Sequence, residues 1–181
     1  MSFGVWSRTG TNVTASTSPK GRLAELYVRH VPDAVRLAYL LTGDRDLAED
    51  LAQEAFARIA GRVVHLRHPD AFWAYLRRTV VNLSRNHFRH RAVEREYLER
   101  EAGGDEPVSA GPDVAAHDVL RRALLALPER QRSALVLRFF EDLSEEDAAT
   151  AMGIPRGTLS SLVARGLAAL RAGGIGVGED A

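Results

Sequence analysis

The feature that most constrains the fold is a run of helical signals over Leu127–Leu170, interrupted by a short turn. Ser144 and Asp147 have the spacing of a capping box, in which a hydroxyl and a carboxylate satisfy free amide groups at a helix start. Gly153 stands where a helix should stop, because glycine tolerates a positive φ, and Pro155 suits the first turn of a following helix. This order predicts a helix-turn-helix.

The second helix of this motif should have one apolar face and one polar face. Its apolar residues recur at helical spacing and should face the core: Leu159, Leu162, Val163, Leu167 and Leu170. The residues left facing outward are candidates for contact with phosphates and base edges: Arg156, Thr158, Ser160, Ser161 and Arg165. From spacing alone, a DNA-binding motif and a plain helical hairpin fit the segment about equally well.

Composition divides the 181-residue chain into two helical blocks. Residues 1–21 are rich in Ser, Thr and Gly with few apolar residues, so we expect a disordered tail there. A helical block follows over 22–100, then a Gly/Pro/acid-rich linker over 101–113, a second helical block over 114–172 and a flexible tail over 173–181. The predicted fold class is all-α, with two small helical domains joined by a flexible linker, the second a helix-turn-helix.

Charge is unevenly distributed in the first block, although the formal net charge of the whole chain is zero. Its basic stretch contains Arg67, Arg77, Arg78, Arg85, Arg89, Arg91 and Arg95, interleaved with the aromatic residues Phe72, Trp73, Tyr75 and Phe88. Arginines neutralise phosphates, and aromatic faces stack on unpaired bases for about 1–3 kcal/mol each. The stretch therefore indicates a surface for an opened DNA strand. The alternative is that the aromatic residues belong to the core and the arginines form a solvated face. For Trp73 alone we favour the core; for the arginines as a group we favour nucleic-acid binding.

An acidic helix should precede this basic stretch, with Asp44 as its cap and the acidic residues Asp46, Glu49, Asp50 and Glu54 along it. Such a face could dock a basic protein, although a solvated face is the commoner explanation.

The sequence predicts no enzyme, no cofactor and no metal site. Cysteine is absent, which excludes disulfides and thiolate ligands. His65/His68 and His87/His90 have a spacing that metal ligands can use, but no carboxylate is paired with them in sequence. No phosphate-binding glycine loop or nucleophile motif is found. No apolar run approaches the ~20 residues that span a bilayer, and the N-terminus lacks an apolar signal core, so we expect a cytoplasmic protein.

Taken in order, three motifs resemble those of the extracytoplasmic-function sigma factors, the two-domain promoter-specificity subunits of bacterial RNA polymerase. The motifs are Gly-Asp-Arg-Asp-Leu-Ala-Glu-Asp-Leu-Ala-Gln-Glu-Ala-Phe at 43–56, Ala-Tyr-Leu-Arg-Arg-Thr-Val-Val-Asn-Leu-Ser-Arg at 74–85, and the helix-turn-helix with its Leu127-Pro128 start. The resemblance covers about residues 22–171.

The resemblance implies a first domain that binds the polymerase and melts the −10 promoter element, and a second domain that binds the −35 element. It would place on the polymerase-binding surface Asp50, Gln53 and Glu54. It would place on or near the −10 surface Tyr75, Arg77, Arg78, Asn82, Arg85, Asn86 and Arg89. The −35 element would face Arg156, Thr158, Ser160, Ser161 and Arg165. Implied partners are core RNA polymerase and promoter DNA, and the family also allows an anti-sigma factor.

Two other functions stay open on the sequence. One is a stand-alone helix-turn-helix regulator that binds a palindromic site as a dimer without polymerase. The other is a sigma-like protein that acts mainly through protein contacts, because Ser160, Leu162 and Ala164 leave the second domain short of cations at its predicted DNA face.

Overall fold

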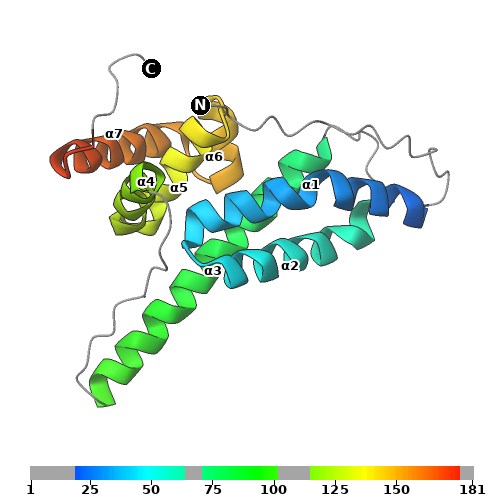
Figure 1. Ribbon diagram of the computed structural model, residues 1–181, viewed down its shortest axis with the longest axis horizontal. Coiled ribbons are helices and arrows are strands. Elements are labelled where there is room, and N and C mark those ends of the chain that lie inside the picture. The colour runs from blue at the N-terminus through cyan, green and yellow to red at the C-terminus, as the bar shows by residue number, and fades with distance from the viewer. Residues whose placement is uncertain (1–18, 64–70, 102–114, 176–181) are drawn as a thin grey trace.

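The computed structural model describes residues 19–63, 71–101 and 115–175, and these residues form helices and turns without a β-strand. The all-α prediction is therefore confirmed for the described part of the chain. The elements are α1 Pro19–Thr42, α2 Arg45–Val63, α3 Ala71–Glu101, α4 Ala115–Ala126, α5 Glu129–Leu135, the π-helical turn η1 Val136–Phe140, α6 Glu145–Met152 and α7 Arg156–Ala172 (Figure 1). None of these helices is long and apolar enough to cross a membrane.

Helices α1, α2 and α3 form the N-terminal unit, and local signals determine where its first two helices meet. Helix α1 ends at Thr42 because Gly43 adopts a left-handed φ of +75°. The Asp44 carboxylate then accepts a hydrogen bond from the Leu47 amide at 3.1 Å, so the predicted cap of α2 is confirmed. Helix α1 already begins at Pro19, within the segment predicted as a tail, because proline suits the first turn of a helix.

Helices α4 to α7, with η1, form the C-terminal unit, and half of the predicted capping box is present at the start of α6, since the Asp147 carboxylate accepts from the Ser144 hydroxyl and not from an amide. The Ser144 hydroxyl accepts a hydrogen bond from the Asp147 amide at 3.1 Å and donates one to the Asp147 carboxylate at 2.7 Å. Gly153 ends α6 with a left-handed φ of +64°. Pro155 caps α7, whose first residue is Arg156, so the turn lies where the sequence predicted it.

The inner face of α7 packs as its apolar spacing predicts. Leu159, Leu162 and Leu170 are buried, and Val163 and Leu167 pack partly buried against the core. The burial of Leu162 corrects the expectation that it takes part in the cation-poor DNA face. Gly166 lets α7 approach α5 closely, because a Cβ at this position would lie 2.9 Å from the Leu135 side chain.

The two units share one hydrophobic core, which the sequence did not predict. The buried cluster joins Leu37, Leu41 and Val80 of the N-terminal unit to Val136 and Leu137 of the C-terminal unit. Helix α3 packs against α6, and α1 packs against α4, α5 and η1. Figure 1 shows the C-terminal unit seated at one end of the three-helix bundle, while the second half of α3 extends beyond it. The predicted linker lies outside the described residues, except Glu101, the last residue of α3.

The two glycines of the helix-turn-helix provide a matched test of this fold. A Cβ at either Gly153 or Gly157 would meet open space, but only Gly153 has a left-handed φ. We expect Gly153→Ala to lower the free energy of unfolding by about 1–2 kcal/mol, because an L-residue is strained there. Gly157→Ala should raise it by about 0.4–1 kcal/mol through reduced unfolded-state entropy. Urea denaturation checks both, and equal effects of the two substitutions would contradict the assigned turn.

Candidate nucleic-acid interface

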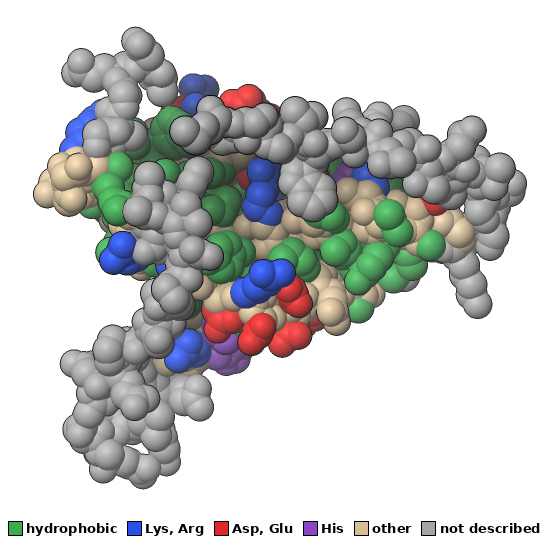
Figure 2. All heavy atoms as spheres, viewed as in Figure 1, with side chains coloured by type: hydrophobic (Ala, Val, Ile, Leu, Met, Phe, Trp, Pro, Cys, Tyr) green, Lys and Arg blue, Asp and Glu red, His purple; other side chains and the backbone are tan. Residues whose placement is uncertain are grey.

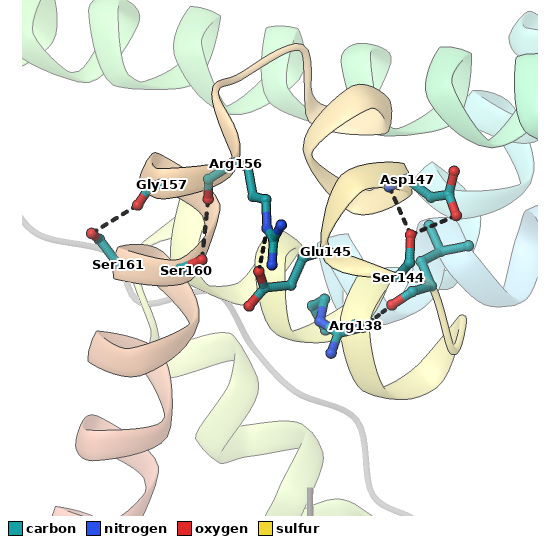
Figure 3. A network of polar contacts seen from close by, with 9 residues as sticks. Arg138, Ser144, Glu145, Asp147, Arg156, Gly157, Ser160 and Ser161 are labelled. Atoms are coloured by element: carbon teal, nitrogen blue, oxygen red, sulfur yellow. Dashed lines mark hydrogen bonds and ion pairs between the residues drawn. The ribbon is translucent and has the colours of Figure 1, made fainter.

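The first candidate surface is the outer face of α7, where an ion pair fixes the first residue of the helix. The Arg156 Nε donates to the Glu145 carboxylate of α6 at 2.8 Å, across the turn of the helix-turn-helix (Figure 3). This hydrogen bond lowers the pKa of Glu145 and raises that of Arg156. The Arg156 side chain is largely open to solvent and the Glu145 side chain is about one third exposed, so solvent screening limits the contribution of this pair to stability. The pair places the Arg156 guanidinium beside Glu145, across the turn between α6 and α7.

Three other predicted residues of α7, Ser160, Ser161 and Arg165, donate hydrogen bonds to backbone carbonyls of the same helix. The Ser160 hydroxyl donates to the Arg156 carbonyl at 3.2 Å, and the Ser161 hydroxyl donates to the Gly157 carbonyl at 2.9 Å (Figure 3). The Arg165 Nε donates to the Ser161 carbonyl at 3.1 Å. Thr158 is half-buried. This face therefore combines the guanidinium groups of Arg156 and Arg165 with short hydroxyl side chains.

The second candidate surface lies on α3, and the structure divides its predicted residues into two groups. Tyr75, Arg78, Asn82 and Arg89 are exposed, and residue Tyr75 is 54% exposed. Arg77, Arg85 and Asn86 are less exposed, and Arg77 and Arg85 pair with Glu141 and Glu129 of the C-terminal unit. Only the first group forms an open polar face on α3.

The aromatic residues of this stretch also divide. Phe72 is fully buried in the core. Trp73 is half-buried and stacks on His30 with the ring centroids 5.6 Å apart, while the Arg77 guanidinium lies 5.9 Å from its ring. Trp73 thus packs against the core, as the sequence favoured. Tyr75 is the exposed member of the set.

A buried carboxylate lies between the two units, and no sequence pattern indicated it. Glu141, just after η1, faces Arg77 of α3 at 3.6 Å and Arg36 of α1 at 3.9 Å. Burial raises the pKa of Glu141, and the two arginines oppose this shift. Burial therefore disfavours the charged carboxylate relative to water. The contribution of Glu141 to the free energy of unfolding is fully present below its ordinary pKa and is lost as the pH rises through its raised pKa.

Further contacts join α3 to the C-terminal unit near its centre. The Arg85 Nη1 donates to the Met152 carbonyl at 3.0 Å, and its Nε lies 4.0 Å from the Glu129 carboxylate. The buried Arg132 of α5 places its guanidinium 4.9 Å from the Phe88 ring. Burial lowers the pKa of Arg132, but a guanidinium stays charged at neutral pH. Sequence patterns could not pair these residues, because the partners belong to different blocks.

The predicted polymerase-binding residues lie on the solvent face of α2. Asp50, Gln53 and Glu54 are all exposed, and Glu54 pairs with Arg58 one turn away at 2.5 Å. Figure 2 shows acidic side chains gathered on one face of the molecule, where Figure 1 draws the start of α2. The described residues contain no group of three or more His, Asp or Glu side chains placed to hold a metal, and His65 and His68 lie outside them.

Two protein families match this chain. The model for sigma-70 region 2 matches residues 26–93, and the model for sigma-70 region 4 matches residues 117–170. The RNA polymerase sigma-E factor of Streptomyces coelicolor is 37% identical over 150 residues, which cover 81% of this chain and 83% of that protein. The ECF RNA polymerase sigma factor SigE of Mycolicibacterium smegmatis is 34% identical over 172 residues, which cover 90% of this chain and 66% of that protein.

Two solved structures are similar to this one. The sigma factor RpoE in complex with the anti-sigma factor NepR from Bartonella quintana gives a TM-score of 0.67 at 25% identity, covering 83% of this chain and 95% of that chain. CnrH in complex with the cytosolic domain of CnrY gives 0.59 at 21% identity, covering 86% and 88%. The second likeness concerns the fold alone.

Proposed function

The chain belongs to the extracytoplasmic-function sigma factors of bacterial RNA polymerase, and we propose that it works as a dissociable factor that binds core polymerase and directs promoter recognition. The observation that carries this proposal is the order of the two family matches, region 2 over 26–93 and region 4 over 117–170. Polymerase performs the chemistry, so the chain needs no catalytic group of its own, and it acts in the cytoplasm with the polymerase.

The N-terminal unit is proposed to hold the opened −10 element along α3. The open polar face of this helix offers Tyr75 for stacking and Arg78 and Arg89 for phosphates, which supports the assignment. Asn82 and Asn86 add hydrogen-bonding groups, and Arg77 and Arg85 would join the surface where the C-terminal unit moves away. Asp50, Gln53 and Glu54 of α2 are proposed to contact the polymerase, since a solvated acidic face suits a basic partner.

The C-terminal unit is proposed to bind the −35 element with α7. Arg156 and Arg165 supply its cations, and Thr158, Ser160 and Ser161 supply short hydroxyl groups. The Ser160 and Ser161 hydroxyls already donate to carbonyls of α7, so the contribution of the arginines to DNA affinity should dominate. The likeness to RpoE bound to the anti-sigma factor NepR supports an anti-sigma factor as a further partner.

A transcription experiment tests the function itself. Purified chain is added to core polymerase with genomic promoter fragments, and transcripts are mapped. We expect transcripts with defined starts that require the chain. Specific binding to a palindrome without polymerase, with no transcript from any fragment, would instead support a stand-alone regulator.

Arg78 tests the −10 assignment, because it is exposed and lies on the open polar face of α3. Arg78→Ala should impair open-complex formation by about 10- to 150-fold, in line with the loss of one charged contact worth about 1.5–3 kcal/mol, while polymerase binding is unchanged. Permanganate footprinting measures the opening, and Arg22→Ala on α1 is the control for losing an exposed arginine. Equal losses of opening and polymerase binding would place Arg78 elsewhere.

Arg156 tests the −35 assignment. On a promoter fragment from the transcription experiment, Arg156→Ala should flatten the slope of log affinity against log salt by about 0.9, the value for one phosphate contact. Glu145→Gln removes the ion-pair partner but keeps the arginine, so the wild-type slope should remain. A slope that does not change in Arg156→Ala would show that this residue does not contact a phosphate.

A further inference from the structure

Helix α1 carries an apolar stripe on its outer side, formed by five residues that we call the α1 stripe. Four of them recur at intervals of four, three and four residues and so share one face of the helix: Ala24, Val28, Val31 and Val35. Val28 is 76% exposed, more than any other large hydrophobic residue in the ranges that the structure describes, and Tyr27 beside it is 41% exposed. Ala24 is also exposed, while Val31 and Val35 pack partly buried against the core.

The partly exposed ring of Tyr27 packs on the three-helix bundle. Its centroid lies 4.8 Å from that of Phe56 on α2 in an edge-to-face contact, and Phe56 is buried. Figure 2 shows hydrophobic side chains gathered where Figure 1 draws the first half of α1 and the second half of α2. An exposed apolar patch on helices that are already folded is typical of a surface that binds another apolar segment.

The chain itself contains an apolar segment that can reach this surface. Residues 1–18 lie outside the described ranges, and three large apolar side chains fall within four residues of them, at Phe3, Val5 and Trp6. The 12 residues 7–18 separate Trp6 from Pro19, the first residue of α1. A spacer of this length extends up to about 40 Å. Val28 lies only roughly 14 Å along the helix from Pro19, so the segment can fold back onto the α1 stripe.

We infer that the segment Phe3–Trp6 packs on the α1 stripe, with the Trp6 ring against Tyr27 and Val28. Phenylalanine and tryptophan side chains bury about 150–250 Å² each, and they favour edge-to-face or offset contacts with another ring. Any protein that binds this face of α1 then has to displace the segment. The inference does not depend on the proposed role of the chain in promoter recognition.

A tethered segment suits this surface better than a second copy of the chain. A stable dimer buries about 800 Å² on each partner, whereas the large hydrophobic residues of α1 that are exposed are only Tyr27 and Val28. A short flexible tether gives its segment an effective concentration in the millimolar range, so a weak contact is enough to keep it bound.

Contact quenching by Trp6 tests the inference in the full chain. The chain has no cysteine, so Arg29→Cys, at an exposed position next to Val28, provides a single site for a bimane dye, which tryptophan quenches on contact. Val28→Asp places a charge in the α1 stripe and should release the segment. Val119→Asp on α4 is the matched control, because Val119 is also exposed, at 48%.

We expect quenching in the labelled chain, loss of quenching in Trp6→Leu and in Val28→Asp, and retained quenching in Val119→Asp. Trp6 is still present in Val28→Asp, so a loss of quenching there reports the position of the segment. Equal quenching in the two valine variants, with circular dichroism showing folded chains, would overturn the inference. Quenching that rises with protein concentration would also overturn it, because a second copy would then supply the tryptophan.

Limited digestion with trypsin gives a second readout without a dye. Arg8 is the only Lys or Arg among residues 1–18 and lies two residues after Trp6. Binding of the segment should slow cleavage after Arg8, because cleavage follows the fraction of chains in which the segment is released. We expect Val28→Asp to be cleaved there at least about fivefold faster than Val119→Asp. Equal cleavage rates in the two variants would overturn the inference.

Discussion

The whole arrangement depends on helix α3, which is packed on its apolar side and charged on the other. Phe72, Leu76 and Val80 fill the core of the three-helix bundle. The same apolar cluster continues into Val136 and Leu137, so the hydrophobic effect that holds the bundle also seats the C-terminal unit. A side chain on α3 near the contact between the two units is therefore either buried against a partner or solvated at the edge of the contact.

At the contact between the two units, apolar packing and ionic contacts have different effects. Apolar burial is non-directional, so it favours docking without choosing polar partners. Glu141, Glu129 and the Met152 carbonyl then face arginines that would otherwise be open to solvent. Because these charges are partly desolvated and incompletely paired, they add little net stability. The C-terminal unit is therefore held on the bundle mainly by apolar contacts, while the polar contacts determine which α3 side chains are covered.

The local elements were predictable from the sequence because their signals act over a few residues. Asp44 and Ser144 cap the helices that follow them, and Gly153 turns the chain at the helix-turn-helix, as their spacing indicates. The apolar face of α7 also follows its periodicity, with Leu162 in the core. The family assignment also rests on short segments, because three family motifs follow one another in the expected order along the chain.

Local patterns in the sequence were thus enough to predict an all-α chain, the helix-turn-helix and membership of a sigma factor family. They could not predict which residues of α3 are exposed, because burial depends on partners far away in the chain. Arg77 and Arg78 are adjacent in sequence, yet Arg77 meets Glu141 and Arg78 faces solvent. Helical spacing separates their directions by about 100°. Helical spacing does not indicate which residues of the C-terminal unit will face Arg77 or Arg78.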